Sequence, residues 1–272
     1  MKNVFNNLEQ TSKEHMKNNI FNNRHIAGVI LAAGKGTRMN LEERNKVTLH
    51  LAEKPIVLHI VEFMKTLPID DIVVVVGHAK ETVMHVLEKE QVIFAEQQQQ
   101  LGTGDALAVA VNSLPQNITD TFVVYGDDAV FYNPKHKPII EQLFIKHVTS
   151  NAAITFLTIE KDNPTGLGRI IRDADGHVQA IVEEKDATAA QKTITEINPG
   201  SFIFKVSFLK KYLPLIKKSP VTGEYYLTSL IDIAVAHNEL VETVKGGKLL
   251  WRGVNTPAEL EEAKILYQQI ER

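Results

Sequence analysis

The sequence predicts an α/β protein in which helices flank a mostly parallel sheet and the second half adds a partly antiparallel lobe. Three observations support this prediction. Continuous apolar runs such as Asp71–Val76 (DIVVVV) are typical of strands buried on both faces of a parallel sheet. Segments with helical spacing separate these runs up to about residue 130, which implies right-handed βαβ units. After about residue 150, strand patterns follow one another with few helices between them.

The first half of the chain alternates between strand and helix patterns. The first strand is predicted over Ile26–Ala33, an apolar run that ends in glycines. A helix follows over Pro55–Lys65, where apolar residues recur every three or four positions. The other elements predicted here are strands at Asp71–Val76, Gln91–Ala95 and Thr121–Tyr125 and helices at Lys80–Glu88 and Thr103–Leu114.

The second half is expected to form further strands and two helices near its end. The strands are predicted at Ala152–Ile159, Gly168–Arg172, Val178–Glu183 and Gly200–Val206, and the helices at Tyr225–His237 and Pro257–Glu271. We divide the chain into an extension at 1–24 and one α/β domain at 25–272. The extension contains seven asparagines, which are poor helix formers, so a weakly ordered segment or a short docking helix is expected.

The composition excludes several classes of protein. The 30 Lys and Arg residues nearly balance the 33 Asp and Glu residues, so the basic excess of a nucleic-acid-binding protein is missing. Because there is no cysteine, a disulfide scaffold, a thiolate zinc site and a cysteine nucleophile are excluded. No apolar run approaches the roughly 20 residues that span a bilayer, and the N-terminus lacks the apolar core of a secretory signal. We expect a cytoplasmic globular protein with no nucleic-acid or membrane partner.

A loop rich in small residues follows the first predicted strand directly. In Leu31–Met39 (LAAGKGTRM) the glycines let backbone N–H groups approach an anion, and Lys35 and Arg38 add positive charge. The loop lacks the hydroxyl residue that a Walker A motif requires after its Gly-Lys pair. Met39 stands where a dinucleotide-binding loop has its third glycine. We interpret the loop as a phosphate site of another kind, the alternative being a turn whose glycines serve geometry only.

Eight further motifs follow the loop in a recognisable order. They are Lys46–Val47, Gln100–Gly104, Tyr125–Asp127, Thr165–Ile170, Val182–Ala187, Glu196–Asn198, Gly223–Thr228 and Gly253–Asn255. With LAAGKGTRM, they resemble sugar-1-phosphate nucleotidyltransferases, and more closely the pyrophosphorylase domain of bacterial N-acetylglucosamine-1-phosphate uridylyltransferases. The resemblance covers about residues 26–256. It implies a Rossmann-like nucleotidyltransferase sheet, with a nucleotide half at about 25–130 and a sugar-binding half at about 131–272.

The resemblance implies that a nucleotide lies over the glycine loop. Arg38 and Lys46 would be the catalytic cations, Arg38 at the β- and γ-phosphates and Lys46 between the α-phosphate and the sugar phosphate. Such cations meet a physical need, because the reaction brings two polyanions together. Gln97, or failing that Gln98, would read the uracil ring together with Gly102. The nucleotide-binding set is Leu31, Ala32, Ala33, Gly34, Lys35, Gly36, Thr37, Gln97, Gln100, Gly102 and Thr103.

The resemblance also implies a sugar site and a metal site. The sugar-binding set would be Tyr125, Gly126, Gly168, Glu183, Asn198 and Tyr226. Asp127 and Asn255 would hold Mg²⁺, since carboxylate and amide oxygens are ligands that Mg²⁺ prefers. Asp127 follows a buried strand, so it is expected at the sheet edge where α/β proteins bind ligands. Asp128 is not expected to contact the metal, because only the first Asp of the pair matches the family.

Four residues depart from the family pattern: Asn45, where Pro is usual; Asp105, where His is common; Ala129; and Pro199, where Thr is usual. Asn45 is expected to give a less rigid loop and a weaker placement of Lys46. Structural alternatives remain for the site residues, among them Lys46 as a solvated loop lysine and Gln97 in a polar loop without ligand contact. Thr103 could be a helix N-cap, Asp127 a turn residue, and Asn255 part of a helix N-terminus.

We expect uridylyl transfer from UTP to N-acetylglucosamine-1-phosphate, with Mg²⁺ as the cofactor and an NDP-sugar and pyrophosphate as products. The alternatives are uridylyl, thymidylyl or cytidylyl transfer to another sugar-1-phosphate, and an inactive nucleotide-sugar-binding regulator. No hexapeptide period is visible. Without the hexapeptide repeats that form the trimeric acetyltransferase part of such uridylyltransferases, acetyl transfer is not expected, and a monomer or small homo-oligomer is expected instead of a trimer.

Overall fold

The structure is a computed structural model that describes residues 21, 24–39 and 41–271, so most of the Asn-rich extension lies outside the described residues. Its strands are β1 (Ile26–Leu31), β2 (His50–Leu51), β3 (Lys54–Pro55), β4 (Asp71–Val76), β5 (Ile93–Glu96), β6 (Asp120–Tyr125), β7 (Ile154–Glu160), β8 (Arg169–Arg172), β9 (Val178–Val182), β10 (Glu196–Ile197), β11 (Phe202–Lys205) and β12 (Val241–Lys245). Its α-helices are α2 (Ile56–Lys65), α3 (Lys80–Val86), α4 (Thr103–Asn112), α5 (Lys137–Ser150), α6 (Ala189–Lys192), α7 (Val206–Tyr212), α8 (Ser229–Ala236) and α9 (Pro257–Glu271). Short 3-10 turns lie at Thr37–Met39 (η1), Lys46–Thr48 (η2) and Leu213–Leu215 (η3).

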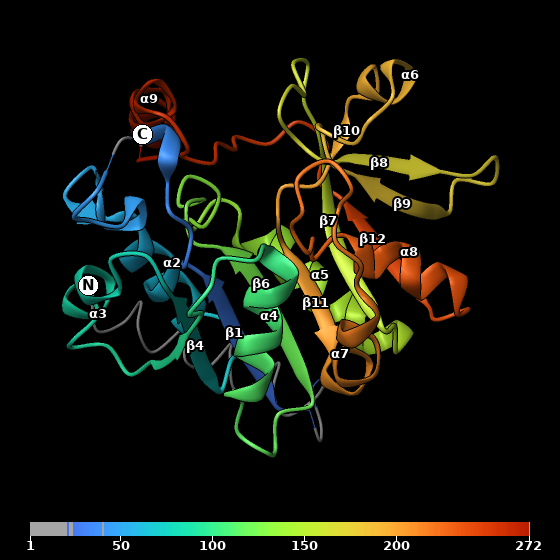
Figure 1. The fold of residues 1–272 in the computed structure, drawn as a ribbon, viewed down its shortest axis with the longest axis horizontal. Coiled ribbons are helices and arrows are strands. Elements are labelled where there is room, and N and C mark those ends of the chain that lie inside the picture. The colour runs from blue at the N-terminus through green and yellow to red at the C-terminus, as the bar shows by residue number, and fades with distance from the viewer. Residues whose placement is uncertain (1–20, 22–23, 40, 272) are drawn as a thin grey trace.

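One large sheet runs through the molecule, in the order β5-β4-β1-β6-β11-β7-β10-β8-β9, with β12 also pairing with β7 (Figure 1). The four strands of the first half, β5, β4, β1 and β6, are all parallel, as their apolar runs predicted. Their side chains alternate between two buried layers. On one face Ile30 and Val74 pack in the same cluster as Ile60 of α2, and on the other Val29 and Val73 join Leu107 of α4. Helices therefore cover both faces of this part of the sheet.

The second half confirms the predicted change of architecture. Strand β11 lies antiparallel between β6 and β7, and β8, β9 and β10 form an antiparallel extension of the sheet. Helix α5 and strand β12 were not predicted. The pattern of α5 was present in the sequence, because its buried residues Ile140, Leu143, Phe144 and His147 recur every three or four positions. Strand β12 is only partly buried and has no comparable apolar run.

Helix α8 begins four residues later than predicted, and tertiary hydrogen bonds explain the difference. The N–H of Tyr225 donates to the carbonyl of Leu101 at 2.8 Å, and the carbonyl of Tyr225 accepts from Gly104 N–H at 2.8 Å. The N–H of Leu227 donates to the Thr103 hydroxyl at 2.9 Å. These bonds hold residues 225–227 outside the helix and beside the start of α4, with the Thr103 hydroxyl used by Leu227, and the N-cap position of α4 is occupied by Gly102.

The last helix returns to the first half of the chain. Helix α9 contacts β2, and Figure 1 shows it in red beside the blue and teal elements. The Tyr267 hydroxyl lies 3.2 Å from His59 Nδ1 of α2. This return carries the segment before α9, including Asn255, across the end of the sheet. In the described part of the chain no helix has both the length and the apolar character required to cross a membrane.

Candidate functional site

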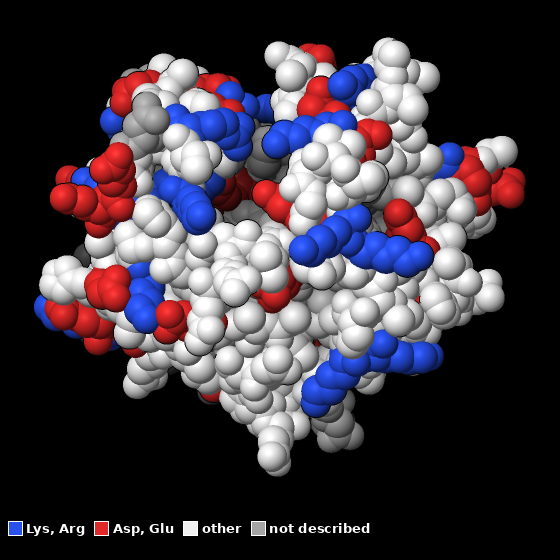
Figure 2. All heavy atoms as spheres, in the orientation of Figure 1, with Lys and Arg blue, Asp and Glu red and all other residues white. Residues whose placement is uncertain are grey.

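A pocket of about 660 Å³ lies where β1 and β6 end, between the two halves of the chain. Twenty of the 21 site residues predicted from the sequence line it: Leu31, Ala32, Ala33, Gly34, Lys35, Gly36, Thr37, Arg38, Lys46, Gln97, Gln100, Gly102, Thr103, Tyr125, Asp127, Gly168, Glu183, Asn198, Tyr226 and Asn255. The exception is Gly126, which is buried beneath the pocket with its N–H bonded to the Leu31 carbonyl at 2.9 Å. Figure 2 shows Lys and Arg side chains on both sides of the hollow and acidic side chains within it.

The glycine loop forms one wall of the pocket. Ala32 and Ala33 are buried where β1 ends, whereas Gly34, Lys35, Thr37 and Arg38 are exposed. Gly36 has φ +60°, a conformation that glycine adopts without strain. The loop therefore presents backbone groups and two cationic side chains to one space, an arrangement suited to a polyphosphate.

Asn45 strengthens the loop, contrary to the expectation that it would loosen it. Its buried carboxamide donates to the Ala32 and His78 carbonyls, each at 2.9 Å. Its Oδ1 accepts from Val47 N–H at 3.1 Å, which caps the η2 turn that carries Lys46. A single side chain thus ties the glycine loop, the end of β4 and the Lys46 turn together.

Replacing Asn45 with Ala is expected to lower kcat by about tenfold, because buried hydrogen bonds that position Lys46 are lost. The KM for the nucleotide is expected to rise by a smaller factor. Asn45→Asp is expected to be at least as damaging, since a carboxylate cannot donate to the two carbonyls. Steady-state kinetics with each variant measures this. A change confined to thermal stability, with kcat intact, would contradict the positioning role.

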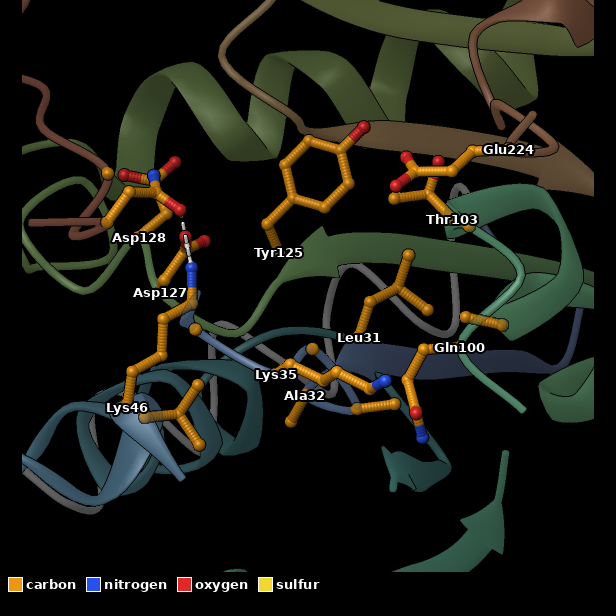
Figure 3. A pocket seen from close by; sticks show the side chains of 18 of the residues that line it. Leu31, Ala32, Lys35, Lys46, Gln100, Thr103, Tyr125, Asp127, Asp128 and Glu224 are labelled. Carbon is orange, nitrogen blue, oxygen red and sulfur yellow. Dashed lines mark hydrogen bonds and ion pairs between the residues drawn. The ribbon is translucent and has the colours of Figure 1, made fainter. Parts of the chain in front are cut away.

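Lys46 lines the pocket and contacts both predicted metal ligands, and Figure 3 shows its side chain directed at Asp127. Its Nζ donates to Asp127 Oδ2 at 2.5 Å and to Asn255 Oδ1 at 2.6 Å. The Lys46 and Asp127 side chains are only 13% and 15% exposed. The side-chain oxygens of Asp127 and Asn255, from segments more than a hundred residues apart, therefore converge on the Lys46 ammonium group.

The backbone brings Asn255 to Asp127. Val254 N–H donates to the Asp127 carbonyl at 3.0 Å, so the Gly-Val-Asn segment runs along the end of β6. Asn255 does not cap α9, because Glu259 N–H bonds to the Thr256 hydroxyl at 3.2 Å and the Glu259 carboxylate accepts from Asn255 N–H at 2.8 Å. The Asn255 side chain is thereby left to face Lys46, while its backbone lies just before the first residue of α9.

Asp128 lines the same pocket but makes different contacts. Its Oδ2 accepts a hydrogen bond from Trp251 Nε1, which also donates to the Pro199 carbonyl at 3.2 Å. Burial raises the pKa of Asp128 well above its ordinary value, and the neighbouring Asp127 carboxylate adds to this. Trp251 is the one tryptophan of the chain and lines the pocket, although it was not predicted as a site residue.

The opposite end of the pocket contains the polar residues of the glutamine run. Gln97 is 4% exposed and faces the pocket with Gln100, whereas Gln98 and Gln99 are exposed outside it. Of the two alternatives, the structure thus brings Gln97 rather than Gln98 to the site. Gly102 has φ +115°, and a Cβ there would lie 2.5 Å from the Tyr225 carbonyl oxygen, so only glycine fits.

The second half contributes a cluster of hydrogen-bonding groups. Glu183 Oε1 accepts from the Thr228 hydroxyl at 2.9 Å, and burial raises the pKa of Glu183. Asn198 Oδ1 accepts from Gly200 N–H at 2.8 Å. Gly200 has φ +92° and packs against the Tyr125 ring, where a Cβ would come within 2.3 Å of it.

Some lining residues were missed from the sequence, and one apparent metal cluster has a structural explanation. Glu224, Leu167 and Gly166 lie within motifs already recognised, so their position beside predicted site residues could have identified them.

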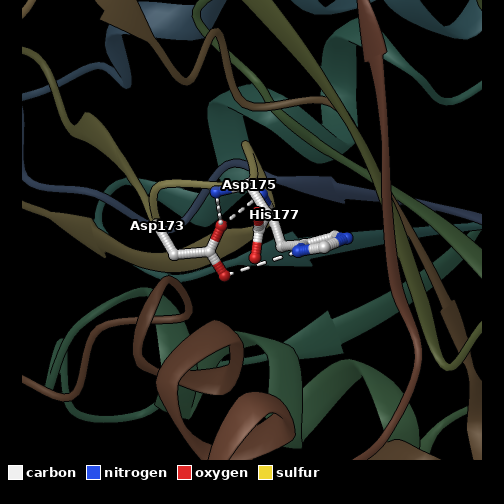
Figure 4. Close-up of side chains that lie close together, drawn as sticks. All are labelled: Asp173, Asp175 and His177. Atoms are coloured by element: carbon white, nitrogen blue, oxygen red, sulfur yellow. Dashed lines mark hydrogen bonds and ion pairs between the residues drawn. The ribbon is translucent and has the colours of Figure 1, made fainter.

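Asp173, Asp175 and His177 lie close together in the β8–β9 hairpin (Figure 4). Asp173 Oδ1 accepts from Asp175 N–H at 3.0 Å and from His177 N–H at 2.8 Å, which are the hydrogen bonds of a tight turn.

The chain is similar to known proteins along nearly its whole length. The sequence model of the family described as Nucleotidyl transferase matches residues 27–270. The bifunctional protein GlmU of Carboxydothermus hydrogenoformans is 41% identical over 219 residues, which cover 80% of this chain and 47% of that protein. The chain spans about half the length of the curated relatives it matches.

Solved structures share the fold. UDP-glucose pyrophosphorylase complexed with UDP-glucose has a TM-score of 0.73 at 16% identity, covering 91% of this chain and 100% of that one. The inositol-1-phosphate CTP transferase from T. maritima has a TM-score of 0.69 at 16% identity, covering 90% and 96%. At these identities the likeness concerns the fold alone.

Proposed function

The chain belongs to the nucleotidyl transferase family, and on that premise we propose that it transfers a uridylyl group from UTP to N-acetylglucosamine-1-phosphate. The products are UDP-N-acetylglucosamine and pyrophosphate. One observation carries most of this proposal: Lys46 lies between Asp127 and Asn255, in the pocket that the glycine loop and Glu183 also line.

The pocket suits an in-line displacement in which a sugar phosphate oxygen attacks the α-phosphorus of the nucleotide. The bond to the pyrophosphate leaving group breaks as the new P–O bond forms. The residues orient two anionic substrates and neutralise charge, which together supply most of the acceleration in phosphoryl-type transfers. In this proposal Arg38 and Lys35 stabilise the leaving pyrophosphate, and Lys46 holds the two reacting phosphates together.

The donors that face Lys46 in the pocket fit Mg²⁺. Asp127 and Asn255 offer a carboxylate and an amide oxygen directed at one point, both within 2.6 Å of the Lys46 nitrogen. Mg²⁺ prefers such oxygen donors and completes its shell with water and substrate phosphates. We propose that these two residues hold the ion, which would supply charge neutralisation at the phosphates when bound.

The choice of substrates follows the relatives and the polar groups of the pocket. The motifs that resemble N-acetylglucosamine-1-phosphate uridylyltransferases support the uridylyl and N-acetylglucosamine assignment, and a relative 41% identical carries the name bifunctional protein GlmU. Glu183 and Asn198 provide two fixed polar atoms each at the sugar end, a common arrangement for reading hydroxyl and acetamido groups.

Pyrophosphate release by the purified chain tests the proposal. The panel pairs UTP, dTTP, CTP and ATP with N-acetylglucosamine-1-phosphate, glucose-1-phosphate and glucosamine-1-phosphate, in Mg²⁺ buffer. The highest kcat/KM is expected for UTP with N-acetylglucosamine-1-phosphate. A different best pair would change the proposed substrates but not the proposed type of reaction. If no pair releases pyrophosphate but nucleotide sugars still quench Trp251 fluorescence, an inactive binding protein would be favoured.

A further inference from the structure

We propose that Asp105 fixes the orientation of the Gln97 carboxamide, so that the pocket reads the ring N–H of a uracil or thymine base and discriminates against cytosine. Asp105 is then a positioning residue that acts through Gln97. This inference rests on the proposed function, because it assumes that the base of a nucleotide lies at Gln97.

The contacts of Gln97 define its orientation. Gln97 Nε2 donates to the Gly102 carbonyl at 3.1 Å and to Asp105 Oδ2 at 2.7 Å. Gln97 follows β5 and lines the pocket, whereas Asp105 belongs to the first turn of α4 and does not line it. The carboxylate therefore lies behind the glutamine, where it supports the side chain without touching a ligand.

The chemistry of the two partners leaves one orientation for the amide. A carbonyl and an ionised carboxylate only accept hydrogen bonds, so the NH₂ group of Gln97 must face both of them. Both of its protons are then used within the protein, and in the described part of the chain Gln97 Oε1 has no donor. A histidine in place of Asp105 would donate or accept according to its tautomer and would not fix the amide in this way.

The surroundings keep this arrangement rigid. The Gly102 carbonyl cannot move freely, because a φ of +115° and the close Tyr225 backbone define its position. Leu101 and Gly104 are both hydrogen-bonded to Tyr225 at 2.8 Å. Gln97 itself is 4% exposed. The oxygen presented to the base is therefore preorganised by its supporting contacts.

An oxygen in this position distinguishes the pyrimidines by the edge they present. Uracil and thymine carry a proton on ring nitrogen N3, which the Gln97 oxygen accepts. Cytosine has a lone pair on the same nitrogen, so two acceptors would face one another and a buried polar atom would be left unpaired. Sites that hydrogen-bond a substrate group discriminate strongly against analogues that cannot make the bond.

Equilibrium dialysis of UTP and CTP, in Mg²⁺ buffer without sugar phosphate, tests the inference. Asp105→Asn preserves the shape but lets the new amide donate as well as accept, so only the Gly102 carbonyl still favours the wild-type orientation of the Gln97 carboxamide. The preference of the wild-type chain for UTP over CTP is expected to fall by about tenfold in this variant, mainly through tighter CTP binding. Asp105→Ala is expected to lower the preference as well. The matched control is Asp162→Asn, which removes an exposed carboxylate paired with Lys248 and should leave the preference unchanged.

Two results would overturn the role of Asp105. One is a wild-type chain that binds UTP and CTP equally, and the other is an Asp105→Asn variant that keeps the wild-type preference. Because dialysis needs no turnover, these results are separate from a failure of the proposed function. That failure would appear as normal base-selective binding without pyrophosphate release.

Discussion

Replacing Asp127 with Asn is expected to lower kcat/KM by about a thousandfold or more, because the carboxylate is the charged ligand proposed for Mg²⁺ and metal ions contribute several kcal/mol to such reactions. The carboxylate also positions Lys46, whose Nζ lies 2.5 Å from Asp127 Oδ2. An amide would keep the shape of the side chain but not its charge. Pyrophosphate release at saturating Mg²⁺ measures the loss, and excess EDTA is expected to abolish the activity of the wild-type chain.

Asp128→Asn is the matched control for this variant. Asp128 is the adjacent aspartate in the sequence, but its Oδ2 contacts Trp251 rather than Lys46. An asparagine still offers an oxygen to the Trp251 N–H, so we expect a change of less than about fivefold. Asn255→Ala is expected to fall between the two. If Asp128→Asn is as damaging as Asp127→Asn, or if activity survives EDTA, the proposed metal site is wrong.

Replacing Lys46 with Met is expected to reduce kcat by about a hundredfold to a thousandfold, because a buried cation aimed at developing charge is lost. A second effect is expected in the opposite direction. The Lys46 ammonium lies 2.5 and 2.6 Å from the oxygens of Asp127 and Asn255. It therefore competes for the oxygens that a divalent cation would use. The variant is expected to bind Mn²⁺ more tightly than the wild type without nucleotide, as measured by electron paramagnetic resonance.

Lys161→Met is the control, because it makes the same change of charge and side-chain length as Lys46→Met at a different lysine. The Lys161 nitrogen lies 5.8 Å from the centre of the Trp251 ring, close to the pocket but not among its lining residues. Its removal should change neither kcat nor Mn²⁺ affinity appreciably. A Lys46→Met variant with near-normal kcat would remove the main support for the proposed reaction. One with weakened Mn²⁺ binding would show that Lys46 and the ion do not compete.

Much of the first half of the fold was predictable, because its physical signals are local. The apolar run Asp71–Val76 forms β4 with the same bounds, and the strands predicted near Ile26 and Thr121 are present as β1 and β6. Residues at the ends of these strands meet in one pocket because parallel strands share a carboxyl edge. The glycine loop and Asp127 could therefore be placed together before the fold was known.

The parts that were missed depend on contacts between distant segments. Tyr225 was assigned to a helix by its local pattern, but its backbone bonds to Leu101 and Gly104 keep it outside the helix. Asn45 was expected to loosen a loop, since nothing in the sequence indicates that its amide reaches Ala32 and His78. The orientation of Gln97 likewise depends on Asp105, which lies on the next helix.

The most direct test of the proposed reaction follows the phosphorus atoms of UTP. The purified chain is incubated with N-acetylglucosamine-1-phosphate and Mg²⁺, with UTP labelled with ³²P at either the α or the γ position. If the chain transfers the nucleotidyl group, the α label enters the nucleotide sugar while the γ label appears in pyrophosphate, in equal amounts. Transfer of the γ label to the sugar, or retention of both labels in UTP by a chain that binds it, would contradict nucleotidyl transfer.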